Sequence, residues 1–421
     1  MKRLSVFSFT EILGKKIYDE FGDVLGILRD IYVTTVEGYP RIIGYKVKRD
    51  GVTYHFEFRS IQYFSKDGKI LIKTRGSKEI LPRTYTYLLS RNLLDKKIVD
   101  INGKQVVRVD DLRIAEIAGE YRVVAVETGN LRKYKKFGLE KIIKFILKVL
   151  GKNTEGTVLR WDDVESLEMV DNNLKLQVPY KKLSKLHPAD LADIIEELDT
   201  KSRRRVFESL DEDLAAETLE ELEQEYKGQV IKELSETKTT ELLENMPSDE
   251  IADILDDLDE EEREKILGNL ESEDAKEVKE LLEYGDETVG SVMTKDFISL
   301  NLDITVKETV EILKETMPDE EEMYYIYITD VNEKIQGVIS LRDLILSPGV
   351  EKLKNIMITD FKKLHHEDHI EEAVELSSKY DLLSVPVVDE KEKLVGIILI
   401  HDIIDEYFYP IWKKKSRKLK D

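Results

Sequence analysis

Cysteine is absent from this 421-residue chain. Its absence excludes disulfide bonds, cysteine nucleophiles and zinc–thiolate sites, and it is typical of proteins from a reducing cytoplasm. Long apolar runs are absent too, because no segment approaches the roughly 18 apolar residues that cross a bilayer. The first residues, MKRLSVFSF, lack the apolar core and small-residue cleavage site of a secretory signal. We therefore expect a cytoplasmic protein without a membrane span.

Catalytic motifs and a surplus of basic residues are missing as well. The sequence contains no nucleophile elbow, Walker loop or HExxH motif. His365, His366 and His369 fall at polar positions of an internal repeat, which disfavours a shared metal site. The net charge of −22 argues against nucleic acid as the main partner. We therefore expect a protein that is not an enzyme.

A twelve-residue repeat occupies residues 186 to 285. Every twelfth position is Leu or Met, and further apolar residues precede most of these markers by three and four positions, as on a helix face. Twelve residues at about 100° each leave roughly 120° of rotation, so one continuous helix would wind this stripe around its axis. The repeat therefore predicts a solenoid of short helices that cover one another's apolar faces. The markers are Leu186, Leu198, Leu210, Leu222, Leu234, Met246, Leu258, Leu270 and Leu282.

The residues after the markers and the charge of the repeat add two further indications. Asp199, Asp211, Ser235, Pro247 and Asp259 follow markers and are typical of helix starts and turns. The region holds 34 Asp and Glu against 11 Lys and Arg, a net charge of −23, so the rest of the chain is close to neutral. This charge fits a solvated acidic face, and it also fits a set of divalent-cation sites.

The N-terminal 80 residues predict a small β-barrel. Segments 24–33 and 41–47 are rich in β-formers, and Asp-Gly pairs at 50–51 and 67–68 are typical of tight hairpins. The stretch ILGKKIYDEFGDVLGILRDIYV (12–33), with RIIGYKV after it, resembles the start of a PRC-barrel domain.

A second copy of this pattern follows. LLDKKIVDINGKQVVRVDDLRI (93–114) matches the first copy, so residues 93 to 183 predict another barrel. Within it, LEKIIKFILKVLG (139–151) predicts a basic amphipathic helix. This helix fits a lid on its own barrel, and it also fits a segment that lies on a membrane surface or docks a partner helix.

The remaining motifs resemble two known families. LHPADLADIIEELD (186–199) and MPSDEIADILDDLDEEER (246–263) resemble the intracellular N-terminal domain of the MgtE magnesium channels. SVMTKDFISL (291–300) recurs as NIMITDFKKL (355–364), and IYITDVNEKIQGVISLRDLI recurs as VPVVDEKEKLVGIILIHDII. These two copies resemble a CBS-domain pair. The first copy carries about five extra residues within TMPDEEEMYY.

We therefore predict a multi-domain α+β chain with two small PRC-like β-barrels, an all-α solenoid of short helices and an α/β CBS pair. The expected segments are 1–85 and 86–184 for the barrels, 185–285 for the solenoid, 286–353 and 354–410 for the CBS copies, and 411–421 for a basic tail. The tail fits a solubilising segment, and it also fits peripheral contact with anionic lipid or an acidic partner.

The MgtE resemblance implies Mg²⁺ between the solenoid and the CBS pair, held by oxygen ligands that also suit other divalent cations. Asp249 and Asp253 are one helical turn apart, so they project from one face. Taken singly, each implied ligand also fits an ordinary surface or capping acid. Position by position, the implied ligands are Glu217, Asp249, Asp253, Glu371, Asp381, Asp402 and Asp405.

The CBS resemblance implies ATP or another adenine nucleotide as a second ligand. Its pattern is a Gly, a Ser or Thr three residues later and an Asp three residues after that. The first copy has Gly337, Ser340 and Asp343, whereas Leu399 replaces the hydroxyl residue of the second copy, which keeps Asp402. The implied nucleotide-binding residues are thus Ser340, Asp343 and Asp402, with at most one intact site.

The leading hypothesis is a soluble regulatory protein that senses Mg²⁺ through acidic sites between the solenoid and the CBS pair. It is not expected to be a transporter itself, because no membrane segment follows the CBS copies in this sequence. We expect a homodimer through the CBS domains and a protein partner at the barrels. Two alternatives remain open: a CBS module that senses adenine nucleotides, and a PRC-barrel scaffold or adaptor without a small ligand.

Overall fold

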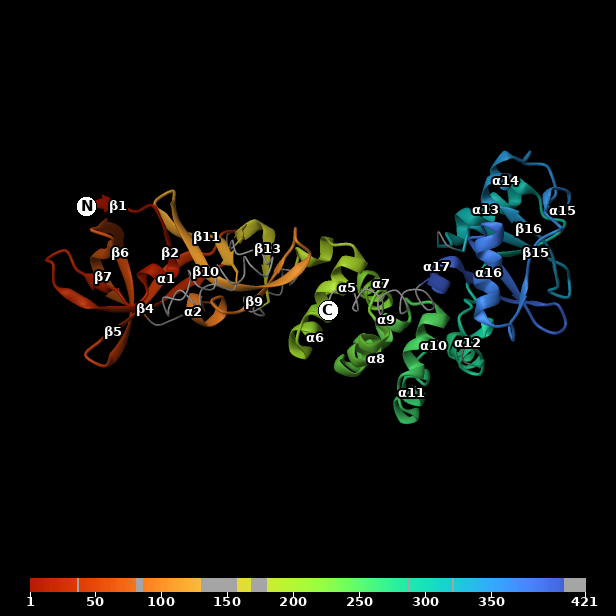
Figure 1. Cartoon of the computed structure of the whole chain (residues 1–421), viewed down its shortest axis with the longest axis horizontal. Coiled ribbons are helices and arrows are strands. Elements are labelled where there is room, and N and C mark those ends of the chain that lie inside the picture. The colour runs from red at the N-terminus through yellow and green to blue at the C-terminus, as the bar shows by residue number, and fades with distance from the viewer. Residues whose placement is uncertain are drawn as a thin grey trace, which may run out of the picture. The chain divides into compact units, whose positions relative to one another are not determined.

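The computed structural model describes residues 1–35, 38–80, 86–129, 157–167, 180–285, 288–319 and 322–404. They divide into two compact units, Met1–Leu222 and Glu223–Asp421 (Figure 1). The predicted amphipathic helix at 139–151 and the basic tail at 411–421 lie outside the described residues.

The first barrel is a closed ring of strands. β4 (Val24–Thr34) pairs with β3 (Lys16–Tyr18) and β5 (Arg41–Arg49), and β5 pairs with β6 (Val52–Lys66). β6 pairs with β7 (Lys69–Glu79), which returns to β3 in parallel. The two Asp-Gly pairs form the predicted hairpin turns, with both residues of each pair at positive φ.

The second barrel repeats this course. β10 (Gln105–Ile117) pairs with β9 (Lys97–Asp100) and β11 (Glu120–Thr128), and β11 pairs with β12 (Thr157–Arg160). After a short turn the chain continues as β13 (Val164–Ser166), which pairs with β9 on the other side of β10. The prediction of two small barrels is confirmed.

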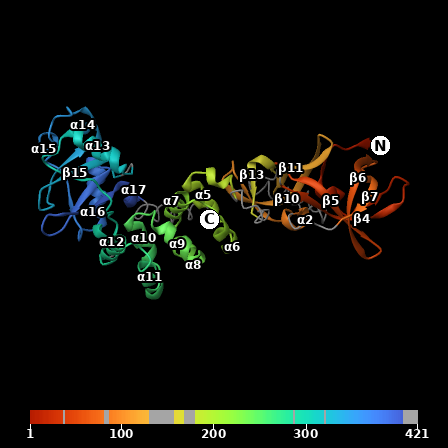
Figure 2. The same ribbon diagram turned by 180° about the vertical axis from the view of Figure 1, so that it is seen from behind.

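The two barrels exchange their first strands. β2 (Val6–Ser8) pairs with β10 of the second barrel, and β8 (Tyr87–Leu88) pairs with β4 of the first. Each exchanged strand leads into a one-turn helix, α1 (Phe9–Ile12) or α2 (Leu89–Asn92). Both barrels consequently share one sheet and one apolar core. Figure 2 shows β4, β5, β10 and β11 of this shared sheet from behind.

A matching pair of carboxylates fixes the exchange. Asp111 on β10 accepts hydrogen bonds from the Thr10 amide (3.0 Å) and hydroxyl. Asp30 on β4 accepts the same two bonds from Ser90, with the amide again at 3.0 Å. Because Asp30 is only 4% exposed, these bonds stabilise a charge that would be costly to bury alone. The two sets of hydrogen bonds are therefore related by the same local symmetry as the exchanged strands.

Short helices follow the barrels, as the repeat predicted. In the first unit these are α5 (Pro188–Glu196), α6 (Thr200–Phe207) and α7 (Glu212–Glu220); in the second they are α8 (Gln224–Glu233), α9 (Glu236–Leu243), α10 (Ser248–Asp256), α11 (Glu260–Leu267) and α12 (Ser272–Leu282).

The caps and markers have the predicted roles. The side chains of Asp199, Asp211, Ser235 and Asp259 each accept a bond from the amide three residues later, which resets the helix. Pro247 stands at the start of α10 without a side-chain cap. Six markers are only 3% to 8% exposed: Leu198, Leu210, Leu222, Met246, Leu258 and Leu270.

Within the first unit, the second barrel covers the end of α5. Lys97 donates to the Glu197 carbonyl at 2.8 Å, and the Glu197 carboxylate accepts from the Val106 amide at 3.2 Å. Lys104 forms an ion pair with Asp190. The barrel thus takes the place of a preceding repeat, which a solenoid end requires.

The CBS pair has two similar three-stranded sheets. In each copy a short first strand runs parallel to the second, and the third is antiparallel to the second. The first copy comprises β14 (Ser299–Asn301), α13 (Val306–Thr316), β15 (Tyr325–Thr329), β16 (Ile335–Ser340) and α14 (Leu341–Leu346), and the second comprises α15 (Leu353–Ile356), β17 (Leu364–His365), α16 (Ile370–Tyr380), β18 (Ser384–Val388), β19 (Leu394–Leu399) and α17 (Ile400–Ile403).

The segment that precedes each CBS copy pairs with the third strand of the other copy. Thr294 bridges to the second copy's β19, and the matching segment before the second copy bridges to β16. A Cβ at Gly396 would lie 2.7 Å from the Met293 sulfur, and one at Gly337 would lie 2.8 Å from the Met357 sulfur. The two glycines of the predicted nucleotide pattern therefore have a packing role, because they admit a crossing segment.

Candidate functional site

The acids of α10 were the central prediction, and the helix presents them as expected. Asp249 and Asp253 are one turn apart on α10. The Asp249 Oδ1 atom is buried and has no hydrogen-bond partner among the described residues. Burial, reinforced by the neighbouring Glu250 carboxylate, raises the pKa of Asp249 to about 7, despite a counteracting hydrogen bond from Thr294. A carboxyl in this state is partly protonated near neutral pH.

Further carboxylates gather around Asp296, whose charge contributes to the raised pKa of Asp249. Burial raises the pKa of Asp296, and the charges of Glu277, Asp319 and Asp274 raise it further. Burial also raises the pKa of Glu322, with added repulsion from Asp296 and Asp319. We call this set the acidic junction; it comprises Asp249, Asp274, Glu277, Asp296, Asp319 and Glu322.

Two contacts hold the elements of the acidic junction together. The Ser248 hydroxyl on α10 donates to the Glu277 carboxylate on α12 at 3.2 Å. Lys295, next to Asp296, forms an ion pair with Glu280 of α12. Glu280 is not a member of the acidic junction, so the charge of Lys295 is paired with a carboxylate outside the junction. The junction therefore combines two solenoid helices with the segment entering the first CBS copy.

The predicted ligands of the second CBS copy flank two helices that pack together. Glu371 lies in the first turn of α16, and Asp381 follows its last turn. Asp402 lies in the first turn of α17, with His401 Nε2 3.1 Å from its Oδ1 atom. Asp405 lies outside the described residues.

Asp381 has the left-handed backbone that most side chains avoid, with φ of 53°. Met317 occupies the same place after α13 of the first copy, with φ of 45°. The conformation is therefore a property of the CBS repeat. It directs the chain from helix to strand, whether or not an ion binds Asp381.

The predicted metal ligands are divided between the two units. Glu217 is exposed on α7 in the first unit, whereas the other described candidates belong to the second. Across the described ranges, no three His, Asp or Glu side chains form a ready-made metal cluster. Mg²⁺ binding would thus use one or two carboxylates per ion with water completing the shell.

The predicted nucleotide residues of the first copy bond to one another. The Ser340 hydroxyl donates to the Asp343 carboxylate at 2.7 Å and accepts from the Asp343 amide at 3.1 Å. This is the start of α14, so the pair caps a helix. Leu399 holds the equivalent place before α17 and supplies no side-chain cap. The difference between the copies that the sequence indicated is therefore visible as a difference in capping.

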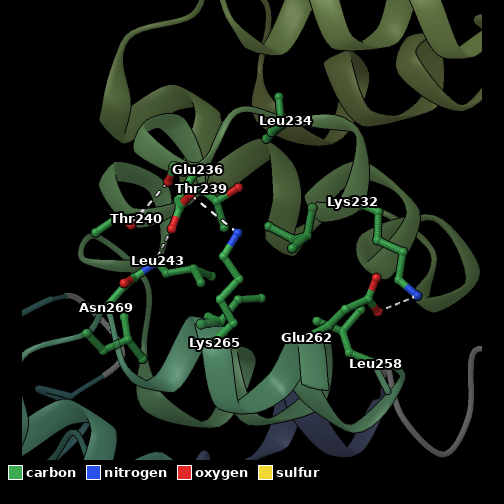
Figure 3. Close-up of a pocket in the computed structure, with 13 residues that line it drawn as sticks. Lys232, Leu234, Glu236, Thr239, Thr240, Leu243, Leu258, Glu262, Lys265 and Asn269 are labelled. Carbon is green, nitrogen blue, oxygen red and sulfur yellow. Dashed lines mark hydrogen bonds and ion pairs between the residues drawn. The ribbon is translucent and has the colours of Figure 1, made fainter. Parts of the chain in front are cut away.

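A cavity of about 200 Å³ opens in the solenoid of the second unit, between α8, α9 and α11 (Figure 3). Lys232 pairs with Glu262 at 2.7 Å, and Lys265 pairs with Glu236 at 3.3 Å. Asn269 also donates to Glu236 at 3.3 Å. Since each lysine already neutralises a carboxylate of the lining, the cavity lacks the excess negative charge of a cation site.

Most members of the acidic junction were absent from the predicted ligand set. Asp296 falls in the SVMTKDFISL motif, and Asp319 and Glu322 fall in the extra residues TMPDEEEMYY. The concentration of acids in an insertion was the available signal. It did not reveal that Asp296 lies near the acids of α10 and α12, because that depends on long-range packing.

Comparison with family models supports this architecture. The MgtE intracellular N domain matches residues 186–287, CBS domains match 289–347 and 353–409, and a PRC-barrel domain matches 5–78. None of the described helices has the length and apolar character of a membrane span. The fold thus defines a class of proteins that join a PRC-barrel to an MgtE-type solenoid and a CBS pair.

Individual proteins point to the same family. The chain is 39% identical over 129 residues to the magnesium transporter MgtE of Enterococcus faecalis, and 35% identical over 129 residues to that of Thermus thermophilus. These matches cover 31% of this chain but only 28% and 29% of the two transporters. A crystal structure of the cytosolic domain of the Mg²⁺ channel MgtE in complex with ATP matches with 32% identity and a TM-score of 0.52, covering 53% of this chain and 92% of that one. Through its solenoid and CBS pair, the chain belongs to the MgtE family.

Proposed function

We propose that this protein is a cytoplasmic regulator that senses Mg²⁺ through its acidic solenoid and CBS pair. The observation that carries the proposal is the position of α10, where a buried, unpartnered Asp249 oxygen faces the entry to the CBS pair. The magnesium transporters named among the relatives support the choice of ion. Because the chain spans less than a third of their length, their transport activity is not carried over.

The sensing step requires no bond chemistry. Without a cation, carboxylates on the solenoid and on the CBS pair repel one another, and their partial burial adds a desolvation cost. A divalent ion with its water shell neutralises two of these charges and lets the surfaces approach. Several such ions make the change steep in Mg²⁺ concentration, because each adds its own linkage free energy.

We assign the ligands to the acids that the sequence indicated. Asp249 and Asp253 would supply the solenoid side. Glu371, Asp381, Asp402 and Asp405 would supply the second CBS copy, and Glu217 would add a ligand from α7. Mn²⁺ and Ca²⁺ also prefer oxygen ligands, so selectivity for Mg²⁺ depends on the size and hydration of each site.

Calorimetry tests this assignment. The double variant Asp381→Asn/Asp402→Asn should lose Mg²⁺ binding relative to the wild type in the millimolar range. Glu375→Gln removes an exposed charge from the same α16 and should bind as the wild type does. Equal Mg²⁺ binding by the wild type and the double variant would refute the role of the second CBS copy.

A second candidate function is nucleotide sensing by the first CBS copy. The ATP complex of a related cytosolic domain favours it, together with the adjacent Ser340 and Asp343 side chains. ATP should raise the thermal midpoint of the wild type, and Asp343→Ala should abolish this rise. Glu315→Ala, which removes an exposed carboxylate from α13 of the same CBS copy, is the control. A rise that survives Asp343→Ala would exclude this site.

We also propose how the protein assembles. Ile345 and Leu346 on α14 are 69% and 68% exposed, which supports pairing of two copies through the CBS domains. The barrels would then present a protein partner-binding surface. Light scattering should find a dimer that Ile345→Asp/Leu346→Asp converts to a monomer; an unchanged mass would place the contact elsewhere.

A further inference from the structure

We propose that the His366 imidazole is a proton-binding site that strengthens the contact between the end of the solenoid and the second CBS copy. Tyr284, which follows the last turn of α12, forms this contact from the solenoid side. The inference goes beyond the proposed function, because it involves none of the acids assigned to Mg²⁺ and needs no metal ion.

The Tyr284 ring packs against the His366 ring and against the backbone of Gly290. The centroids of the two rings are 5.2 Å apart, and their planes make an angle of 51°. A Cβ atom at Gly290 would lie 2.7 Å from the Tyr284 Cδ1 atom and 3.0 Å from the His366 carbonyl oxygen. The absence of a side chain at Gly290 therefore allows the tyrosine to approach this closely.

Backbone hydrogen bonds hold the segment after the solenoid against the second CBS copy. Two amides of η3 (Val289–Ser291) take part. The Val289 amide donates to the Asp368 carbonyl at 2.8 Å, and the Gly290 amide donates to the His366 carbonyl at 2.9 Å. The contact between the rings thus lies beside a fixed pairing of main chains, whose opening can be measured.

A carboxylate of the second copy faces the His366 ring. The Glu390 Oε1 atom, in the turn between β18 and β19, lies 3.5 Å from the His366 Nε2 atom. The His366 side chain is 16% exposed and that of Glu390 is 71% exposed. An imidazolium at this place would therefore have an ion-pair partner that water also reaches.

The other charged groups around the two rings come from the solenoid and from the turns of the second copy. Glu280 of α12 is already paired with Lys276 and Lys295. Asp368 accepts a hydrogen bond from the His365 amide at 2.7 Å. The remaining groups are Glu283, His369 and Asp389.

The first CBS copy has the same backbone pairing without the rings. Leu302 holds the place of His366 in the repeat, and Lys354 holds the place of Gly290. The Lys354 amide donates to the Leu302 carbonyl at 3.1 Å, just as Gly290 donates to His366. Neither of these side chains titrates near neutral pH. The titratable ring is therefore specific to the copy that contacts Tyr284.

Protonation of His366 should strengthen the contact with Tyr284. Histidine changes its charge between about pH 8 and about pH 5. A cation within roughly 6 Å of a tyrosine ring is attracted by the ring face, which at a partly exposed site favours the closed contact about two- to five-fold. This contribution is present at low pH and is lost as the ring loses its proton, so the end of the solenoid is held more firmly in acid.

Hydrogen–deuterium exchange of the full chain in metal-free buffer tests this site. After correction for the intrinsic pH dependence of exchange, protection of the Val289 and Gly290 amides should rise about two- to five-fold from about pH 8 to about pH 6. His366→Leu, which matches the first copy, should abolish the rise. Tyr284→Leu should also abolish it, because it keeps an apolar side chain but removes the ring. His369→Gln changes an exposed side chain without a capping bond and should retain the rise.

Glu390→Gln provides a second variant at an exposed side chain. It should move the rise to lower pH, because the charged ring loses its ion-pair partner. A rise that survives His366→Leu or Tyr284→Leu, or one that His369→Gln abolishes, would overturn the inference. A wild type whose protection is independent of pH would overturn it as well. None of these measurements involves Mg²⁺, so their failure is distinct from a failure of the proposed function.

Discussion

Neutralising Asp249 should make the metal-free protein more stable. The pKa of this carboxyl rises from 3.8 to about 7 on folding. At ~1.4 kcal/mol per pKa unit, keeping it ionised costs on the order of 4 kcal/mol at pH 8 and above. Because relaxation and solvent reduce this cost, we expect Asp249→Asn to gain about half of it in stability. For a unit of this size, that gain raises the thermal midpoint by roughly 4 to 8 °C.

The pH dependence follows from the sign of the shift. An acid whose pKa is raised on folding binds more protons in the folded state, so its contribution to stability falls as pH rises from about 4 to about 7. The difference in stability between Asp249→Asn and wild type should therefore be small at pH 4 and largest above pH 7. Chemical denaturation in metal-free buffer at several pH values measures this difference.

Saturating Mg²⁺ should reverse the order, because the wild type gains an ion that Asp249→Asn binds poorly. The control is Glu273→Gln, which removes an exposed charge from α12 and should change neither curve by more than a few tenths of a kcal/mol. A metal-free Asp249→Asn protein that is less stable than the wild type at pH 8 would contradict the reasoning.

Three further predictions concern packing and buried charge. Gly396→Ala should destabilise the CBS pair by about 1 to 3 kcal/mol in chemical denaturation, because its Cβ would lie 2.7 Å from the Met293 sulfur; an unchanged midpoint would disprove the close crossing. Asp30→Ala should cost about 2 to 4 kcal/mol, because it leaves the Ser90 amide and hydroxyl without their acceptor; amide exchange at residue 90 is the direct measurement. Lys227→Ala should lower the free energy of unfolding by about 3 kcal/mol, because it leaves the mostly buried carboxylate of Glu250 on α10, 2.6 Å from the lysine, without its partner. A loss below about 1 kcal/mol in chemical denaturation would show that water reaches the pair.

The solenoid was predictable because its rules are local. A Leu or Met at every twelfth position, followed by a residue such as Asp199 or Asp259, specifies both the apolar face and the point where the next helix starts. Both predicted caps have the expected bond in the structure. The two CBS copies were equally predictable, because one sequence pattern occurs twice at similar spacing.

The exchange between the barrels was not predictable from such patterns. β2 pairs with β10 more than 100 residues away, and no periodicity in either strand specifies its partner. Asp30 and Asp111, one in each copy, were a signal that could have been read, because a buried carboxylate on a barrel strand needs donors.

The positions of the candidate site residues in the fold were predictable only in part, for the same reason. Motif positions identified Asp249, and its place on α10 is as expected. Its neighbour Asp296, and Glu322 beside Asp296, come from a loop and an insertion, whose positions depend on how the CBS pair packs against α12. Local sequence determines which residues are acidic, whereas tertiary packing determines which acids meet.

Small-angle X-ray scattering of the full chain against Mg²⁺ concentration tests the central claim most directly. If divalent ions hold the acidic surfaces of the solenoid and the CBS pair together, the radius of gyration should decrease in the millimolar range, and Asp249→Asn should weaken that decrease. A radius that stays constant while calorimetry detects bound Mg²⁺ would contradict the account.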